Sequence, residues 1–269
     1  MRRFTGWCAD GAFRTAHELR LMGFYIKDAQ EIEGMRQAGR IVARVLDHIA
    51  DRMKPGITLT QLARWCQEFI TGEGGKPAFL GYRGFPGAVC TSVNDEVVHG
   101  IPGPRRIREG DLVKLDVGVI KNGLYADGAR TFVIGSTPPR TQELVAATEQ
   151  ALYLGIEQAT AGKRGSDISC AIQRFVETRG FSVVRDLSGH GVGIELHEEP
   201  AVPNFGKPGT GRKLVPGMTL AIEPMVNLGA FEVLTEANGW TVKTRDGAPS
   251  AHFEHTVLVT GGPAEILTQ

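Results

Sequence analysis

The sequence predicts an α+β domain in which a duplicated helix, helix, strand unit packs around one sheet. The duplication is indicated by residues 55–74 and 161–180, which share a turn, a helix cap, a short amphipathic helix and a closing glycine. Each stretch follows a longer helical pattern and precedes strand-like runs. A hairpin is predicted over residues 112–135, because Asn122-Gly123 is a dipeptide that joins two antiparallel strands tightly.

The length of 269 residues allows one large α/β or α+β domain or two small ones, and the hydrophobic content of 42% is ample for a sizeable core. We expect this domain to span residues 27–269, with half-repeats over about 27–138 and 139–269. Residues 1–26 are expected to form a flexible N-terminal extension. Its four arginines leave a short transit peptide as an alternative, and Met22 is an alternative start of the chain.

Charge and cysteine usage exclude several classes of protein. Thirty basic and thirty acidic residues cancel, which argues against binding of nucleic acid or a membrane surface through bulk charge. No apolar run approaches the roughly 18 residues that a spanning helix needs. The chain has four cysteines, which are scattered without a CxxC pair: Cys8, Cys66, Cys90 and Cys170. We therefore expect a reducing, cytoplasmic location.

The first predicted element is a helix over residues 28–53, where apolar residues recur at helical spacing. Asp28 and Glu31 are placed like a capping pair, and Pro55-Gly56 ends the run. A second amphipathic helix follows over about 59–70. The two helices together form the first helix pair.

The second half repeats this order. A long helix is predicted over about 141–161, and a shorter one opens at Ser166 or Asp167 and ends at Gly180. Four strands are expected after it, at about 181–187, 217–226, 229–235 and 251–260.

The predicted hairpin carries two aspartates inside apolar strand runs. Its register places Asp116 opposite Ala129 and Asp127 opposite Gly118, so both carboxylates project from one face, about 7 Å apart at the backbone. Two carboxylates on an apolar face are costly to ionise unless they share a cation. The hairpin thus predicts a metal site, with a salt bridge to Lys114, on the same face, as the structural alternative.

Three further polar spots lie in apolar or glycine-rich surroundings. His190 and His197 fall within SGHGVGIELHEEP, and Glu223 ends the apolar run MTLAIE directly before a proline. In AHFEHTVLVTG, His252 and Glu254 share one strand face. Taken singly, each has a structural explanation, such as a buried histidine with its hydrogen bonds satisfied or a charge on an edge strand.

Taken together, the Asp, Asp, His, Glu, Glu series suits two divalent metal ions. Four carboxylates balance the charge of two such ions, and oxygen and nitrogen donors suit Mn, Fe, Co or Zn. Two neighbouring ions lower the pKa of a shared water and polarise a carbonyl group, so hydrolysis is the expected chemistry.

The motifs DVG, YADGART, GHGVGIELHEEP, MTLAIEPM and AHFEHT, preceded by VNDEVVHGIP, closely resemble those of type I methionine aminopeptidases of the bacterial type. The resemblance runs from about residue 27 to the C-terminus and rests on the joint order and spacing of the motifs. It implies the pita-bread fold, an antiparallel sheet covered by two pairs of helices with an internal pseudo-twofold repeat. It also implies five metal ligands: Asp116, Asp127, His190, Glu223 and Glu254. Of these, Asp127 and Glu254 are implied to bridge both ions.

The resemblance implies removal of the N-terminal methionine from peptides and nascent proteins, with a small second residue favoured. A metal-bridging hydroxide would attack the first peptide bond, while His197 assists at the carbonyl, His99 at the amide, and Glu223 moves a proton. It further implies a pocket for the substrate, lined by Phe79, Tyr82, Phe85, Cys90, His99, His197 and Trp240. Two positions depart from some relatives, which have cysteine in place of Phe79 and threonine in place of Gly118.

Three alternatives remain at this point: a sister proline-specific metallopeptidase of the same fold, a non-catalytic pita-bread binding protein, and a cysteine hydrolase. The last would use Cys90 as nucleophile with His99 as base. The expected partners are substrate N-termini, with the ribosome as a further candidate, and no nucleic acid or membrane. A monomer is the expected oligomeric state.

Overall fold

The computed structural model of the chain describes residues 5–7, 13–15 and 25–269. Two short strands, β1 (Thr5–Trp7) and β2 (Phe13–Thr15), pair antiparallel. The extension expected over residues 1–26 otherwise falls almost wholly outside the described residues, so that boundary stays a prediction. Within the described part, every helix is too short or too polar to pass through a membrane.

The first helix pair matches the predicted one. Helix α2 (Ala29–Ala50) begins after Asp28, whose carboxylate accepts hydrogen bonds from the backbone N–H groups of Gln30 and Glu31. Helix α3 (Leu59–Gly72) begins with a second capping box, built on a threonine and a glutamine. Both helices are therefore fixed at their first turn by side chains that the sequence already indicates.

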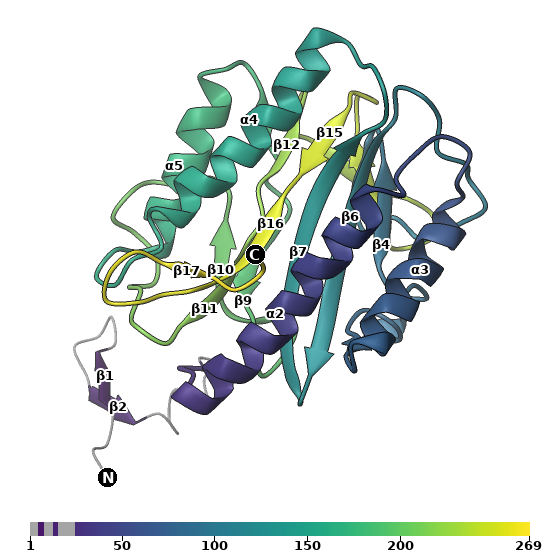
Figure 1. The fold of residues 1–269 in the computed structure, drawn as a ribbon. Coiled ribbons are helices and arrows are strands. Elements are labelled where there is room, and N and C mark those ends of the chain that lie inside the picture. Colours follow the sequence, from purple (N-terminus) through teal and green to yellow (C-terminus); the bar gives the residue numbers. More distant parts are fainter. Residues whose placement is uncertain (1–4, 8–12, 16–24) are drawn as a thin grey trace.

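The second pair consists of α4 (Pro139–Ile156) and α5 (Gly165–Glu177). The predicted start of the shorter helix at Ser166 or Asp167 is wrong by one to two residues. The reason is that the Asp167 carboxylate acts from inside the first turn and accepts a hydrogen bond from the N–H of Arg164, 2.8 Å away. Figure 1 shows this pair over the strands of the second half, while α2 and α3 lie against those of the first half.

The hairpin of β6 (Leu112–Lys121) and β7 (Leu124–Val133) has the predicted register throughout. Asp116 pairs with Ala129, and Asp127 pairs with Gly118. Asn122 and Gly123 both take positive φ values, 53° and 82°, as a two-residue turn of this kind requires. The side chains at even positions of β6 therefore face away from those at odd positions, which pack beneath α2 and α3.

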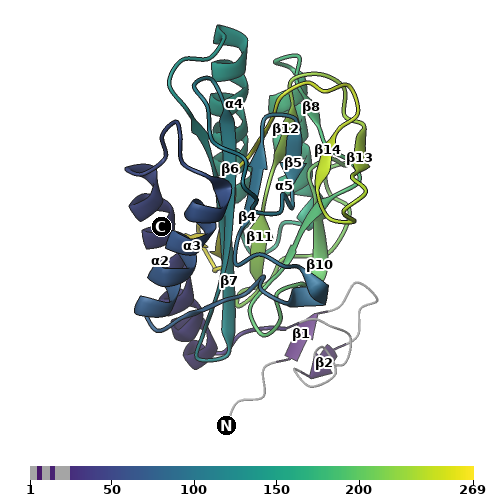
Figure 2. The same cartoon turned by 90° about the vertical axis from the view of Figure 1, so that its right-hand side faces the viewer.

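This hairpin lies toward one edge of an antiparallel sheet. Among the described residues the sheet has nine strands, in the order β10-β9-β11-β16-β7-β6-β3, with β17 beside β16 and β4 beside β6. The strands that join the hairpin are β3 (Lys76–Pro77), β4 (Cys90–Val93), β9 (Ser188–Gly191), β10 (Glu198–Pro203), β11 (Thr219–Ile222), β16 (Glu254–Leu258) and β17 (Glu265–Ile266). In the side view of Figure 2, α2 and α3 lie on one side of β6 and β7, and β13 and β14 lie on the other.

Two smaller sheets complete the described strands. One contains β15 (Ser250–His252), β12 (Met225–Asn227) and β8 (Ser182–Val183); the other contains β13 (Val233–Thr235), β14 (Val242–Thr244) and β5 (Glu96–Val98). A short 3-10 turn, η1 (Tyr82–Gly84), lies between β3 and β4. The sequence did not predict β10 or β14, and it placed a glycine-rich turn where β9 runs.

The strands predicted at 217–226 and 251–260 are each broken in two, which corrects the expectation of continuous strands. The break separates β11 from β12 at Glu223-Pro224, and β15 from β16 at Phe253. Proline has no N–H to offer a neighbouring strand, so the ladder is weakened there. The register is the same on both sides of the break, which places Glu223 opposite Glu254 where the strands pass from one sheet to the other.

The core lies between the helix pairs and the sheet. In the first half it joins helix residues such as Val45 and Leu62 to the odd-numbered residues of β6, among them Leu115 and Val117. In the second half a separate cluster joins α4 and α5 to β11 and β16 through Leu152, Ile172, Leu220 and Val257. Each half thus buries one sheet face under its own helices, which leaves the opposite face for polar side chains.

Candidate metal centre

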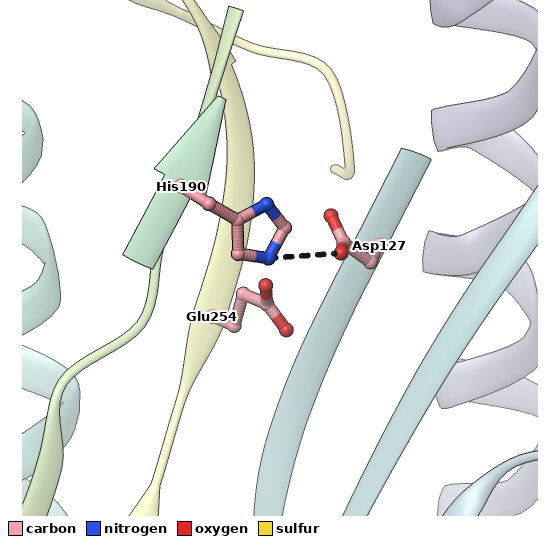
Figure 3. Close-up of side chains that lie close together, drawn as sticks. All are labelled: Asp127, His190 and Glu254. Atoms are coloured by element: carbon pink, nitrogen blue, oxygen red, sulfur yellow. Dashed lines mark ion pairs between the residues drawn. The ribbon is translucent and has the colours of Figure 1, made fainter. Parts of the chain in front are cut away.

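The five residues predicted as metal ligands come together on the sheet face that the helices leave uncovered. Together with the aromatic residues described below they line one pocket. The imidazole Nε2 of His190 lies 3.7 Å from Asp127 Oδ2 and 3.6 Å from Glu223 Oε1. One ligand atom each of Asp127, His190 and Glu254 lie within 4.8 Å of one another, and Figure 3 shows these three side chains pointing toward a common centre.

The sheet register explains this convergence. Glu254 of β16 pairs with Ala129 of β7, which in turn pairs with Asp116 of β6. Two carboxylates therefore flank a methyl group across three neighbouring strands, and the small side chain leaves the space between them open. His190 is brought in from the other side, because β9 pairs with β11 through Ala221.

The carboxyl groups of the cluster are strongly perturbed. Burial raises the pKa of Asp116, Asp127, Glu223 and Glu254 above the ordinary values of these groups, and mutual repulsion raises the pKa of Asp116, Glu223 and Glu254 further. Asp116 Oδ1 is buried and has no hydrogen-bond partner among the described residues. A cluster of this kind is unfavourable in its ionised form unless cations balance it.

His190 is arranged as a metal ligand. Its Nδ1 lies 2.9 Å from the carbonyl oxygen of Gly191, so the ring proton belongs on Nδ1 and the lone pair of Nε2 faces the carboxylates. Burial lowers the pKa of His190 to about 4, which keeps this ring neutral. Four oxygen-donor side chains and one imidazole nitrogen fit divalent cations, and the fully orphaned Asp116 oxygen fits a coordinated atom.

Lys114 does not provide the alternative salt bridge across the hairpin. Its fully buried ammonium donates to the carbonyl oxygens of Asn94, at 2.7 Å, and Ser250, at 3.1 Å. The salt bridge of the hairpin within the described residues joins Arg130 to Asp47 instead. Lys114 thus fastens the turn before β5 to the start of β15 and leaves Asp116 without a counter-ion.

Thr256 holds Asp127 in place from the neighbouring strand. Its hydroxyl oxygen accepts a hydrogen bond from the Asp127 N–H, and it lies 3.0 Å from Asp127 Oδ1. This role of Thr256 was not predicted from the sequence. Its spacing of two from Glu254 places it on the same strand face as that residue, but its contact with Asp127 spans 129 positions and has no local signal in the sequence.

The pocket beside the ligands is lined by all seven residues predicted for it: Phe79, Tyr82, Phe85, Cys90, His99, His197 and Trp240. Arg83 and Leu196 line it as well and were not predicted. The rings of Phe85 and Trp240 meet edge to face with centroids 5.2 Å apart. The pocket wall is therefore mainly apolar and aromatic, whereas its floor is polar.

His197 lies between the wall and the floor. Its Nδ1 is 2.8 Å from the Tyr82 hydroxyl, and its ring centroid is 4.2 Å from that of His190. Burial, followed by the neighbouring His190, lowers the pKa of His197 to about 4. The ring is therefore neutral at pH 7 and carries one N–H and one lone pair.

The loop that ends at His197 is held by a buried ion pair that was not predicted from the sequence. Glu198 accepts hydrogen bonds from the N–H groups of Ile194, at 2.5 Å, and Glu195, at 3.0 Å, and it pairs with the ammonium of Lys27. Both charged side chains are 1% exposed. The residue that leads into α2 therefore fixes a loop 170 positions further along the chain.

Two other residues of the pocket have distinctive local structure. His99 has a φ of 59° in the left-handed region, next to Gly100, where a Cβ would lie 2.2 Å from Thr91 O. Burial, followed by Asp116 and Glu254, raises the pKa of the Cys90 thiol well above its ordinary value. A thiol that resists ionisation is a poor nucleophile, which disfavours the cysteine-hydrolase alternative.

Comparison with known proteins identifies the family. The sequence profile of metallopeptidase family M24 matches residues 33–261. The chain belongs to this family. Its antiparallel sheet and two helix pairs are thus those of an M24 metallopeptidase with the pita-bread fold.

Relatives of this M24 chain cover nearly all of it. It is 49% identical over 243 residues to a methionine aminopeptidase of Clostridium perfringens, which covers 90% of this chain and 98% of that protein. A crystal structure of methionine aminopeptidase from Thermotoga maritima is 48% identical, with a TM-score of 0.90 over 91% of this chain and 98% of that one. A prolidase from Pyrococcus furiosus, at 24% identity and a TM-score of 0.75, shares the fold over 65% of its own length.

Proposed function

We propose that this M24 metallopeptidase removes the N-terminal methionine from peptides and nascent proteins and favours a small second residue. The observation that supports this most strongly is the pocket itself, in which five potential metal ligands form the floor and aromatic residues form the wall. The relatives named methionine aminopeptidase, at 44% to 49% identity, agree with this proposal.

Two divalent ions are the proposed cofactor, with Mn, Fe, Co or Zn as candidates. Asp127 and Glu254 would bridge them, and the remaining ligands would be Asp116, His190 and Glu223. When bound, such ions supply Lewis acidity, which lowers the pKa of a coordinated water and polarises the carbonyl of the first peptide bond.

The proposed roles of the protein side chains follow from their protonation and position. The Tyr82 hydroxyl orients the neutral His197 ring, which lies beside the ligands and can stabilise the negative charge that develops on the substrate carbonyl oxygen. Glu223, whose Oε1 lies 3.6 Å from His190 Nε2, would pass a proton to the leaving amine. His99 would contact the substrate amide.

Specificity for methionine is assigned to the aromatic wall. An unbranched thioether fits a lining of Phe79, Phe85 and Trp240, because sulfur packs favourably against ring edges. Burying a side chain of this size contributes roughly 1.5–3 kcal/mol, which allows strong but incomplete discrimination against other residues.

The direct test is release of methionine from Met-Ala-Ser by protein loaded with Mn or Co, compared with cleavage of an Ala-Pro peptide. We expect cleavage of the first peptide only, loss of activity after chelation, and no loss after thiol alkylation. Cleavage of the Ala-Pro peptide alone would support the proline-specific alternative. Activity that survives metal removal and is lost on alkylation would contradict the metal-dependent proposal.

A variant of a bridging ligand tests the site itself. Asp127→Ala is expected to abolish methionine release, because both ions would lose a shared oxygen ligand. Near-normal activity in this variant would refute the bridging role of Asp127. A non-catalytic binding protein would show no release in either form, even with metal bound.

We further propose a monomer in the cytoplasm that acts on emerging chains, with the ribosome as a partner. Three cysteines within the described residues, Cys66, Cys90 and Cys170, are free thiols, which suits a reducing compartment. Co-sedimentation with ribosomes and analytical ultracentrifugation would test these two points.

A further inference from the structure

His252 is a buried imidazole for which the preceding sections give no role. It ends β15, is 1% exposed, and neither of its ring nitrogens has a hydrogen-bond partner among the described residues. Buried polar groups nearly always have such a partner, because leaving one unpaired costs about 1–3 kcal/mol. Two unpartnered nitrogens on one ring therefore call for an explanation.

The backbone of His252 is held firmly. Its N–H donates to the Thr131 hydroxyl oxygen at 2.9 Å, and the same hydroxyl donates to the His252 carbonyl oxygen at 2.7 Å. His252 also pairs with Met225 across the β12–β15 ladder. The backbone that carries the ring is therefore well anchored, although the ring itself lacks hydrogen-bond partners among the described residues.

The nearest carboxylate belongs to a predicted metal ligand. His252 Nε2 lies 3.6 Å from Glu223 Oε2, and His190 Nε2 lies 3.6 Å from Glu223 Oε1. The Glu223 carboxylate is therefore flanked by two imidazoles, one at each oxygen. The two rings differ, because Nδ1 of His190 is engaged by Gly191 O, whereas both nitrogens of His252 are open.

We propose that His252 is a positioning residue whose Nε2–H donates to Glu223 Oε2 and so directs the other oxygen of Glu223 to the metal centre. A shift of less than about 1 Å closes the gap to a normal hydrogen-bond length. The proton on Nε2 is present in the protonated ring and in one neutral tautomer, so the assignment needs no change of charge. The inference rests on the metal-binding part of the proposed function.

The test compares two replacements of similar volume, His252→Gln and His252→Met. Glutamine keeps an N–H donor, and methionine has none. Calorimetric titration of the metal-free proteins with Mn²⁺ is expected to show a Kd that is larger for His252→Met by on the order of 10- to 100-fold. This is the usual loss of affinity when a metal ligand loses its hydrogen-bond partner. For His252→Gln, the Kd for Mn²⁺ is expected to lie within about 3-fold of the wild-type value. With Co²⁺ bound, this variant is expected to have the same visible absorption spectrum as the wild type.

His255→Gln is the matched control. His255 lies on the same chain segment but faces away from the ligands, with its Nδ1 2.8 Å from Thr268 Oγ1 and its ring beside Tyr153. Its replacement is expected to leave the Kd for Mn²⁺ and the Co²⁺ spectrum unchanged. Wild-type affinity in His252→Met, or equal losses in the glutamine and methionine variants, would overturn the proposal.

A second measurement uses the wild-type protein, so it does not depend on the folding of any variant. In ¹H–¹⁵N spectra of histidine side chains with Zn²⁺ bound, the proposal requires a slowly exchanging proton on His252 Nε2. A bare Nε2 that shifts on addition of Zn²⁺ would make His252 a ligand and overturn the positioning role. Neither readout needs methionine release, so failure of the proposed substrate is distinguishable from failure of this inference.

Discussion

At the residue scale, Gly118 and Phe79 form a matched pair. A Cβ on Gly118 would lie 2.5 Å from Phe79 Cε1 and 2.9 Å from Cζ, closer than real contacts allow. The aromatic ring therefore occupies the space that any other residue at position 118 would need. Phe79 and Gly118 are the two positions at which the sequence departs from some relatives. The Phe79 ring fits here because residue 118 has no side chain.

Gly118→Thr is expected to displace the Phe79 ring into the substrate pocket. Overpacking of this kind costs about 1–3 kcal/mol, and the narrowed pocket should raise KM for a methionine peptide more than it lowers kcat. Steady-state kinetics of Gly118→Thr, with and without Phe79→Cys, measures the coupling. Gly72→Ala, where a Cβ meets nothing within 4 Å, is the control. Failure of Phe79→Cys to restore KM would contradict the pairing.

Glu254 gives a prediction about pH. Burial, then the neighbouring carboxylates, raises its pKa in the folded protein, so without metal the folded state keeps a proton that the unfolded state loses as pH rises. Glu254 therefore lowers the stability of the metal-free protein increasingly above its unfolded pKa. Glu254→Gln should stabilise the metal-free protein at pH 8 and have little effect at pH 4.

Urea unfolding of both proteins in a chelator, at pH 4 and pH 8, measures this difference. With Mn²⁺ present the order should reverse, because the variant lacks a charged ligand. Equal effects of Glu254→Gln at the two pH values in chelator would show that the Glu254 pKa is close to its unfolded value.

At the element scale, the hairpin of β6 and β7 could be predicted to the residue, whereas the strands of the second half could not. A two-residue Asn-Gly turn fixes the pairing, and the alternation of Asp116 and Gly118 with Leu115 and Val117 fixes the faces. The break after Glu223 occurs where a pair of strands passes from one sheet to the next. In the other case, β14 pairs with β5, which lies about 145 positions earlier in the chain. Neither event leaves a local signal in the sequence.

The candidate site divides in the same way. Its five predicted ligands stood out because ionisable residues in apolar or glycine-rich surroundings need an explanation, and all five line the pocket. The supporting residues, such as Thr256, Glu198 and Lys27, resemble ordinary surface or strand residues until the fold buries them. Their roles depend on contacts across more than a hundred residues, which no local pattern contains.

The ion pair of Lys27 and Glu198 leads to a prediction at this scale. Lys27→Met leaves a buried carboxylate without its cation and is expected to cost about 3–5 kcal/mol in the free energy of unfolding. Lys27→Met combined with Glu198→Gln should cost less than the sum of the single changes, as urea unfolding would show. The partly exposed pair of Arg36 and Glu265 is the control, with an expected cost of Arg36→Met of about 1 kcal/mol or less. Additive losses at the buried pair would refute the coupling.

At the scale of the whole molecule, metal binding should stabilise the fold. A ligand that binds only the folded state adds about 2.7 kcal/mol when its concentration is 100 times its Kd. We expect Tm to rise with Mn²⁺ concentration in the wild type and to stay constant in Asp127→Ala. Scanning calorimetry over a range of metal concentrations measures both, and a rise of Tm in Asp127→Ala equal to that of the wild type would place the binding site elsewhere.

The placement of the ligands has a further consequence for the two halves. Asp116 and Asp127 lie on the hairpin of the first half, while Glu223 and Glu254 face each other on the broken strand pair of the second. Ions held between them would link the two halves as a noncovalent crosslink at the seam between β7 and β16. Removal of metal should then speed amide hydrogen exchange first along this seam, while exchange within each helix pair stays slow.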